Sequence, residues 1–515
     1  MKSLSVRALS AWMMVASVAA FVAGCGIFVV GPDYEEPQFE ASDAPLPDAG
    51  YPTTNKTATG EFAPAETNAD PRVEITSEDL VEWWKRFNDP VLSELVEGVV
   101  SNNISFLMAF ERLEQARWRL LGSAADAFPS IEMNGKAYEQ EYGRGTPSGS
   151  SAGRKIHTDY FRGGFDATWE IDIFGGVRRG VEAAYASVQS QEWSLKDTWV
   201  SLTAEIGADY ISLRTVQQRL RVARANLKIQ SETYDILKSR LDSGIGDELA
   251  VKQAKYNVEQ TRAGIPTLLA SEEELMNALA ILAGEMPGAL HEKLRDLPDR
   301  DWLIAPRKLS EIPLDLMRSR PDVKSTERAL AAQVASVGVA KSLLYPKFYI
   351  NGSLGLESYK WNDLFHRKSL VGAIGPSFSW PIFQGGNLVA NLREEESKMN
   401  EAILKYELAL QTAFSEARNA YAAYTQQYHR YQSLERAVKA AQDAESISQD
   451  LYKNGLSDFN NVLDAQRSLL SLEESLVISR GQISLDLLSL YKALGGGIAM
   501  QAQPRAAAVQ PQPQL

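Results

Sequence analysis

The chain is poor in the residues on which most catalytic and metal-binding sites depend. Among its 515 residues there is one cysteine and there are four histidines, and the histidines are scattered. A single cysteine excludes a disulfide framework, and isolated histidines provide no Cys/His cluster for a metal ion. The sequence motifs of phosphate-binding loops, zinc proteases and serine hydrolases are missing as well. We therefore expect no cofactor, no metal site and no catalytic residues, which argues against an enzyme.

Positive charge is also scarce. The chain carries 66 acidic and 53 basic residues, for a formal net charge of −13, and it has no block of lysine and arginine. Proteins that bind nucleic acids neutralise phosphates with clustered basic side chains. We therefore expect no nucleic-acid partner.

Long apolar runs are confined to the N-terminus. Lys2 and Arg7 flank the start of an uncharged apolar stretch, residues 8–23, and this pattern predicts a secretory signal peptide over residues 1–24. No later stretch approaches the ~20 apolar residues that a transmembrane helix needs. If the rest of the chain crosses a membrane, it must do so with strands.

The single cysteine directly follows that apolar stretch. The small residues Val22–Gly24 precede Cys25, and this ending resembles a bacterial lipobox, in which the cysteine becomes the lipidated first residue of the mature protein. Gly26 follows, and the absence of aspartate there permits transport to the outer membrane under the best-known bacterial sorting rule. The alternative is an ordinary signal peptide that happens to contain a cysteine.

Two flanking segments lack the large apolar side chains of a folded domain. Residues 25–80 are rich in Pro, Ala, Thr and acidic residues from about position 35 onward, and we predict an extended, lipid-anchored segment. Residues 498–515 are rich in Pro, Gln and Ala, which predicts a disordered tail.

The part of the chain between these flanks is an internal duplication. Matching residues between Trp169 and Gly284 recur at a constant offset of 211 positions, and no insertion or deletion breaks that offset. A register held over such a length indicates two copies with elements of equal length, and we divide the chain into a first repeat, 81–300, and a second repeat, 301–497. The matched pairs include Trp169 and Trp380, Glu205 and Glu416, Tyr210 and Tyr421, Gly244 and Gly455, Asp247 and Asp458, and Gly284 and Gly495.

Each repeat contains two strand patterns. Apolar and polar residues alternate over about ten positions in residues 131–142 and 160–173, and again in 348–356 and 370–382. Such alternation, with a tryptophan near one end, is typical of membrane β-strands around a wet lumen. A half-buried sheet in a soluble sandwich gives the same pattern, so the strands alone leave both alternatives open.

Each repeat also contains a very long helical pattern. Residues 177–241 and 387–453 contain no proline, which predicts helices about 100 Å long. Soluble globular helices seldom exceed 25 residues, so these are predicted to be coiled-coil helices or staves of a helical barrel. An earlier helix is predicted over residues 91–127, ended by Phe128 and Pro129.

Short turns follow the long helices and lead into shorter returning helices. Gly244 and Gly455 follow the last helical turn, as glycine does at a helix C-terminus. Asp247 and Asp458, three residues later, are positioned to cap the returning helix. These four residues mark two hairpin tips that we expect to contact a partner protein.

Four motifs occur in a characteristic order. Val30–Pro37 follows the lipobox, Trp83–Leu92 opens the first helix, Arg318–Val323 opens the second repeat, and Val462–Arg467 lies on the second returning helix. Together with the lipobox and the duplication, they resemble the TolC-type outer-membrane factor family, in its OprM-like (NodT) lipoprotein branch. In Arg320–Asp322, proline suits a first helical turn and aspartate suits the helix dipole, so we assign this motif to the fold.

The resemblance implies an α+β membrane protein. Four strands cannot close a barrel, and an open sheet edge in lipid leaves backbone groups unpaired. The family's solution is a homotrimer with a twelve-stranded transmembrane β-barrel, continued by a periplasmic α-helical barrel. The implied function is the passive outer-membrane exit channel of a tripartite efflux pump, with an RND-type inner-membrane transporter and a periplasmic adaptor as partners. The alternatives are a non-conducting, lipid-anchored coiled-coil adaptor or scaffold, and a periplasmic hydrolase.

The family's closed periplasmic aperture suggests a role for Asp464. Three copies around one axis form a ring of negative charge that focuses potential and attracts cations. The alternative is a surface ion pair with Arg467 on the same helix. The enteric members of the family have a second aspartate where this chain has Asn461, whose repeat counterpart is Ala250. We therefore predict an aperture of Asp464, Asn461 and Arg467 with one acidic ring.

Overall fold

A computed structural model of the chain describes residues 29–37, 73–74, 80–142, 156–296, 307–308 and 314–496. The predicted signal peptide, Cys25, most of the N-terminal segment and the C-terminal tail lie outside these residues. Within the described part of the chain, no helix is both long and apolar enough to span a membrane.

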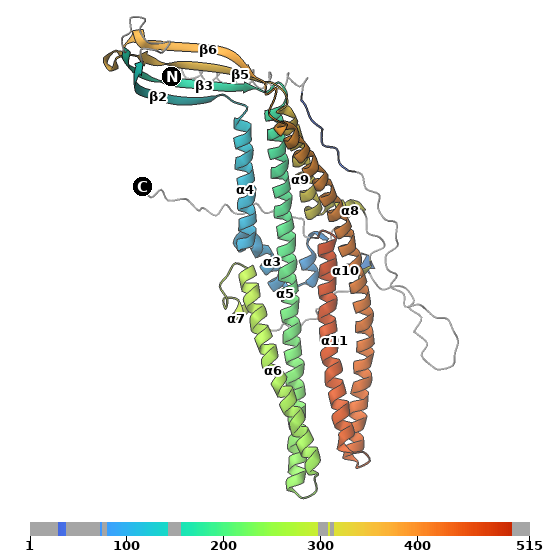
Figure 1. The fold of residues 1–515 in the computed structure, drawn as a ribbon. Helices are drawn as coiled ribbons and strands as arrows, with labels where there is room; N and C mark the ends of the chain where they lie inside the picture. Colours follow the sequence, from blue (N-terminus) through green and yellow to red (C-terminus); the bar gives the residue numbers. More distant parts are fainter. Residues whose placement is uncertain are drawn as a thin grey trace, which may run out of the picture. The chain divides into compact units, whose positions relative to one another are not determined.

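The two repeats form helical hairpins of equal dimensions (Figure 1). The long helices α5 (Gly176–Asp242) and α10 (Asn387–Lys453) contain 67 residues each. The returning helices α6 (Glu248–Leu282) and α11 (Phe459–Ala493) contain 35 each. Every start and end in the second copy lies 211 residues after its counterpart, as in 387 − 176 = 211. The predicted helix lengths are therefore confirmed.

Glycine ends both long helices as the sequence predicts. Gly244 and Gly455 adopt φ angles of +77° and +70°, a conformation that costs glycine little. The next residue then donates its backbone N–H five residues back, from Ile245 to Arg240 at 3.0 Å and from Leu456 to Leu451 at 2.9 Å. Both turns are Schellman motifs, which satisfy carbonyl groups that the helix end leaves unpaired.

The four predicted strands form one antiparallel sheet. Its strands are β2 (Ser130–Tyr142), β3 (Ile156–Ile171), β5 (Lys347–Ser358) and β6 (Leu370–Ser379), in that spatial order. Each repeat supplies one pair of antiparallel strands, β2 with β3 and β5 with β6. The repeats join between β3 and β5, where Gly164 pairs with Gly355. A β-carbon on Gly164 would lie 2.6 Å from the Gly355 Cα, so this seam requires glycine.

Neither face of the sheet is covered by the part of the chain that the structure describes. Among the residues of these four strands whose side chains the structure describes, none is buried. Large apolar side chains such as Phe165, Ile374 and Phe378 are exposed. A half-buried sandwich sheet would have one face covered by the chain's own side chains, and the described residues form no such sandwich.

The entry into the first repeat differs from the single helix predicted over 91–127. The structure has α3 (Pro90–Asn102) and α4 (Ile104–Ala125), separated at Asn103. Asn103 is extended, and its Oδ1 accepts the Phe106 backbone N–H at 2.9 Å while its Nδ2 donates to the Leu282 carbonyl at 2.8 Å. The prediction of one helix was wrong because this side chain caps a new helix and bonds to α6 at the same time.

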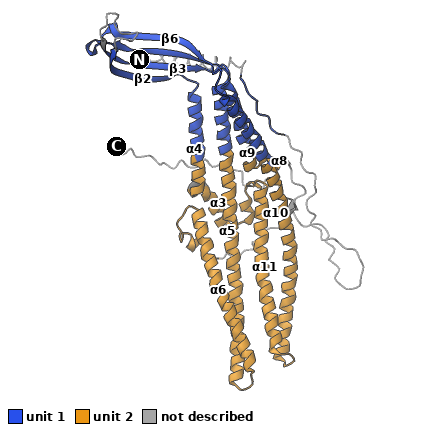
Figure 2. Cartoon of the chain, viewed as in Figure 1, with its two compact units in different colours: residues 1–38, 112–191, 325–407 blue, residues 39–111, 192–324, 408–515 orange. Residues whose placement is uncertain are grey.

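The chain divides into two compact units, and each unit takes segments from both repeats (Figure 2). Unit 1 comprises residues 1–38, 112–191 and 325–407 and contains the sheet. Unit 2 comprises residues 39–111, 192–324 and 408–515 and contains both hairpin tips. The shorter elements are β1 (Val73–Glu74), η2 (Trp83–Phe87), α7 (His291–Leu294), β4 (Arg307–Lys308), α8 (Leu314–Ser319), α9 (Pro321–Ser342), η3 (Trp361–Asp363) and η4 (Arg367–Ser369).

An aromatic cluster secures the start of the first repeat within unit 2. Trp83, Trp84 and Phe87 are buried, and the Trp83 ring meets both neighbours edge to face, at centroid distances of 5.8 and 6.0 Å. Trp84 also meets Trp199 of α5 edge to face at 6.4 Å. These contacts fix the start of the first repeat against α5.

The start of the second repeat is secured by a buried arginine. Pro321 is the first residue of α9, and Asp322 lies in its first turn. Arg320 donates to Asp322 at 2.7 Å, to Glu416 of α10 at 2.7 Å and to the Ala493 carbonyl of α11 at 2.9 Å. The Arg-Pro-Asp motif therefore has the structural role that the sequence predicts.

Candidate functional site

The two hairpins meet beside their tips through an apolar cluster in unit 2. This tip cluster joins α5 and α6 of the first repeat to α11 of the second, and Tyr234, Leu241 and Tyr452 pack against it. Burial of such side chains holds the hairpins together without directional bonds. The buried members are Leu237, Ala250, Val251, Ala254, Phe459, Val462 and Leu463.

A polar contact spans the hairpins next to the tip cluster. Arg467 of α11 donates from Nε and Nη2 to the Asn257 Oδ1 of α6, at 3.0 and 2.9 Å. Its guanidinium also lies 5.6 Å from the centroid of the Tyr256 ring, within the range of a cation–π contact. We call the Arg467–Asn257 contact the hairpin bridge. It is directional, so it specifies one relative position of α6 and α11.

Asp464 points to solvent in the single chain. Its carboxylate lies 3.8 Å from the nearest guanidinium nitrogen of Arg467, and its side chain is 76% exposed. An exposed pair at this distance contributes little to stability. The ion pair considered from the sequence is present but loose, whereas the stronger contacts of Arg467 cross to Asn257. Asn461 is also exposed and donates to the Ser457 hydroxyl at 2.9 Å.

The two tips differ in their helix caps. Asp247 accepts the Leu249 backbone N–H at 3.0 Å, whereas the Asp458 side chain makes no capping hydrogen bond. The cap prediction is confirmed at Asp247 and wrong at Asp458. In the second tip, the Asp458 backbone carbonyl accepts the Asn461 N–H at 3.2 Å, and the Asn461 side chain reaches Ser457. Ala250, the counterpart of Asn461, lacks the amide for that side-chain contact.

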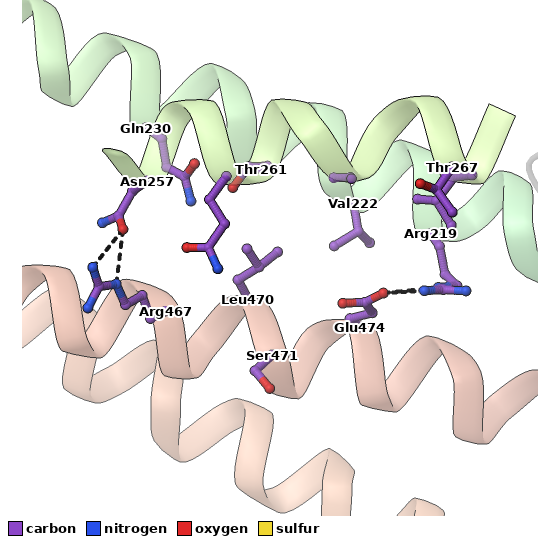
Figure 3. Close-up of a pocket in the computed structure, with 14 residues that line it drawn as sticks. Arg219, Val222, Gln230, Asn257, Thr261, Thr267, Arg467, Leu470, Ser471 and Glu474 are labelled. Carbon is purple, nitrogen blue, oxygen red and sulfur yellow. Dashed lines mark hydrogen bonds and ion pairs between the residues drawn. The ribbon is translucent and has the colours of Figure 1, made fainter. Parts of the chain in front are cut away.

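Farther from the tips, further polar contacts join α5 to α11. Arg219 donates to Glu474, from Nε at 3.1 Å and also from Nη2. Asn226 donates to Glu473 at 3.1 Å. Residues of α5, α6 and α11 line a cavity of about 540 Å³. Figure 3 shows the hairpin bridge at one end of this space and the Arg219–Glu474 pair at the other.

Sequence reasoning found Asp464, Asn461 and Arg467 but missed Asn257, the residue that connects Arg467 to the other hairpin. The only available signal was that the two copies disagree here: Tyr256 is the counterpart of Arg467, and 256 + 211 = 467. In the structure these counterparts contact each other. In the described part of the chain, no group of three His, Cys, Asp or Glu side chains is placed to hold a metal ion.

The family model for outer membrane efflux proteins matches residues 95–285 and 313–496, one stretch in each repeat. The chain belongs to the outer membrane efflux protein family. It is therefore a protein of the bacterial outer membrane, as the sequence predicts, and its family is one of efflux channels rather than of enzymes.

Curated relatives match over almost the whole chain. Nodulation protein T of Rhizobium leguminosarum bv. viciae is 30% identical over 481 residues, which cover 93% of each protein. The antibiotic efflux pump outer membrane protein ArpC of Pseudomonas putida is 27% identical, with 93% of this chain and 94% of the relative covered. The probable outer membrane lipoprotein SilC of Salmonella typhimurium is 26% identical, with 93% and 97% covered.

Solved structures agree with this assignment. The outer-membrane channel OprN has 32% identity and a TM-score of 0.79, with 91% of this chain and 99% of OprN covered. The open state of the Neisseria gonorrhoeae MtrE channel has 27% identity and a TM-score of 0.74, with 91% and 98% covered. The mostly helical fold with a four-stranded sheet is thus the fold of outer-membrane channels.

Proposed function

We propose that three copies of this chain form a passive exit channel of a tripartite efflux pump. The observation that carries the proposal is the sheet, whose edge strands β2 and β6 have no partner within the described chain. Unpaired backbone groups are costly in lipid, and four strands are too few to close a barrel. Pairing β6 of one copy with β2 of the next gives a closed barrel of twelve strands from three chains.

The two faces of the sheet support the same assembly. Apolar side chains such as Phe165, Leu354 and Ile374 are exposed, although each would be stabilised by removal from water. Polar residues alternate with them, for example Asp166 and Ser353, which pair across β3 and β5. One face then contacts lipid and the other lines a water-filled lumen.

The hairpins supply the periplasmic end of the channel in this proposal. Asp464, Asn461 and Arg467 form the aperture, with three Asp464 carboxylates in one ring. The hairpin bridge and the tip cluster hold the closed position. Opening requires the hairpin of α10 and α11 to move away from that of α5 and α6.

The tips supply the contact with the adaptor in this proposal. Gly244–Asp247 and Gly455–Asp458 are equivalent turns, and each presents one exposed apolar residue, Ile245 and Leu456. These two residues are repeat counterparts, since 245 + 211 = 456. A periplasmic adaptor thus meets two similar tips per chain and couples the channel to an inner-membrane transporter of the RND type. Lipidation of Cys25 anchors the N-terminus in the outer membrane.

Conductance tests the proposed function directly. The purified protein should migrate as a heat-modifiable, SDS-resistant trimer and should conduct ions after insertion into planar lipid bilayers. A coiled-coil adaptor would give neither result, because it would have no closed barrel. A purified trimer that inserts into bilayers and never conducts, at any voltage or in any salt, contradicts the channel.

The acidic ring makes a separate prediction for Asp464→Asn. The ratio of cation to anion permeability should fall roughly three-fold or more, because a ring of like charges shifts the local potential by several kT. Reversal potentials in a salt gradient measure this ratio. Asp443→Asn on α10 is the matched control, since it removes the same charge from an exposed site outside the aperture. Equal shifts in both variants would show that Asp464 acts only through net charge.

A further inference from the structure

The turn between β5 and β6, residues 359–369, folds into a compact loop within unit 1. α9 leads into β5, and β6 leads toward α10, so this turn lies at the opposite end of the two strands from the helices (Figure 1). The loop contains η3 and η4, its Leu364 is buried, and the Ser369 hydroxyl donates to the Asp363 carbonyl at 2.7 Å. β5 has 12 residues, and about 9–11 are enough for a tilted strand to cross the hydrocarbon core of a membrane. We call residues 359–369 the β5–β6 loop.

Two exposed aromatic rings extend one face of the sheet into this loop. Trp361 meets Phe161 of β3 edge to face at a centroid distance of 5.4 Å, and Phe365 meets Trp361 in the same way at 5.8 Å. Phe161 lies four residues before Phe165, so both side chains are on one face of β3, and Phe165 pairs with Leu354 of β5 on that face. The two loop aromatics are therefore continuous with the apolar face of the sheet.

The same loop carries positive charge, although the chain as a whole is acidic. Lys360, Arg367 and Lys368 against the single Asp363 give a formal charge of 3 − 1 = +2. Lys368 pairs with Asp363 at 2.9 Å, and His366 lies 3.9 Å from the same carboxylate. Lys360 and Arg367 are exposed and form no ion pair with any residue that the structure describes. Two cations are thus available to an anion from outside the chain.

Aromatic rings beside an apolar face, with cations next to them, match the border between lipid and water. Aromatic side chains gather at this border in membrane β-barrels. Headgroup phosphates lie just outside the hydrocarbon, and arginine and lysine bind phosphate through charge-assisted hydrogen bonds. A free anion would use the cations alone and would leave Trp361 and Phe365 in water, at 58% and 73% exposure. The two features together favour an anionic lipid.

We propose that the β5–β6 loop binds a phosphorylated glycolipid of the outer leaflet, of the lipid A class. Lys360 and Arg367 bind a headgroup phosphate, while Trp361 and Phe365 contact the acyl chains below it. The position of this loop at the outer surface, with the helices in the periplasm, rests on the proposed function. Each chain carries one lipid site, and the bound lipid holds the outer end of the sheet at the height of the headgroups.

Diphosphoryl lipid A tests the proposal in a titration of the purified full-length protein in detergent, followed by native mass spectrometry. One lipid A per chain should bind saturably. The double variant Lys360→Gln/Arg367→Gln should bind roughly ten-fold or more weakly. Arg393→Gln/Lys405→Gln is the matched control, because it removes two exposed positive charges from α10 within unit 1, and it should bind as the wild type does. Absence of saturable binding, or an equal effect of the two double variants, overturns the proposal.

Two other ligands separate the proposed lipid from anions in general. Phosphatidylglycerol offers a single negative charge to two cations, so it should bind roughly ten-fold or more weakly than diphosphoryl lipid A. Inorganic phosphate should not displace lipid A, because it lacks the acyl chains that contact Trp361 and Phe365. Equal affinity for the two lipids, or displacement by inorganic phosphate, would show that the loop attracts any anion and would exclude a glycolipid site.

Phe365→Ser provides an independent variant that keeps both cations. It should weaken lipid A binding by roughly three-fold or more, because the ring that contacts the acyl chains is lost. The side chain is largely exposed in the wild type, so the temperature of thermal unfolding should not change. Wild-type affinity for lipid A in Phe365→Ser would show that the aromatic rings take no part, which contradicts the lipid assignment.

The position of the loop is measured apart from lipid binding. Asn362→Cys places a thiol at an exposed site in the loop, and it should react with a membrane-impermeant maleimide added to intact cells, above the background of the wild type with Cys25. Ser243→Cys, exposed at a hairpin tip, should not react. Labelling of the tip in place of the loop contradicts the outer position. A protein that binds lipid A through the loop but never conducts contradicts the proposed function and leaves the lipid site intact, whereas a conducting channel that binds no lipid A overturns the lipid site alone.

Discussion

Arg467→Ala should open the channel. The substitution removes both hydrogen bonds of the hairpin bridge, at 3.0 and 2.9 Å. A hydrogen bond to a charged group contributes about 1.5–3 kcal/mol, and the 47% exposure of Arg467 lowers this to about 1 kcal/mol per chain. If three chains open together, the ratio of open to closed channels should rise roughly a hundred-fold. Single-channel recording in planar bilayers measures that ratio.

The partner residue provides the stringent control. Asn257→Ala should open the channel to a similar degree, and the double variant should add little, because both substitutions remove the same contact. Arg262→Ala is the matched negative control on α6: its ion pair with Glu259 is exposed and stays within one helix. Wild-type gating in both Arg467→Ala and Asn257→Ala would exclude the hairpin bridge as a latch.

Gly207→Ala should destabilise unit 2. A β-carbon at Gly207 would lie 2.4 Å from the Trp83 Cη2 and 3.0 Å from Leu488. Trp83 is 2% exposed and is held by two edge-to-face neighbours, so its rigid ring has no free space to enter. Overpacking of this kind costs about 1–3 kcal/mol. Thermal unfolding followed by circular dichroism should show the loss.

Gly98→Ala is the matched control for that substitution. Gly98 lies in α3, within the same unit, and a β-carbon there meets no atom within 4 Å. Alanine favours a helix by up to about 1 kcal/mol over glycine, so this variant should be as stable as the wild type or more stable. Equal losses in the two variants would mean that the Trp83 contact is not the cause.

The elements could be predicted because their signals are local. The absence of proline from residues 177–241 and 387–453, and the glycines after them, predict both long helices and their turns. The duplication adds an internal check, since each copy predicts the bounds of the other. The break at Asn103 was missed because the residues around it suit a helix, and its cause is a side-chain bond to the distant Leu282 carbonyl.

The candidate site was only half predictable. The Val462–Arg467 motif singled out Asp464 and Arg467 by resemblance, but an i,i+3 spacing suggested that they bond to each other. The structure pairs Arg467 with Asn257 on another hairpin, 210 residues away in the sequence. No helical periodicity relates residues on two different hairpins.

The sequence by itself determined the family and the outer-membrane location, because short motifs carry that information. It also determined the equal hairpins and the strands, because helix length, turn type and side-chain alternation depend on neighbours a few residues apart. Tertiary structure decided which residues meet: the Gly164–Gly355 seam between the repeats, the hairpin bridge, and the residues of α5, α6 and α11 that line the cavity. These contacts join segments that only folding brings together, so they depend on how the hairpins lie against each other. That relative position is also what an opening channel would change.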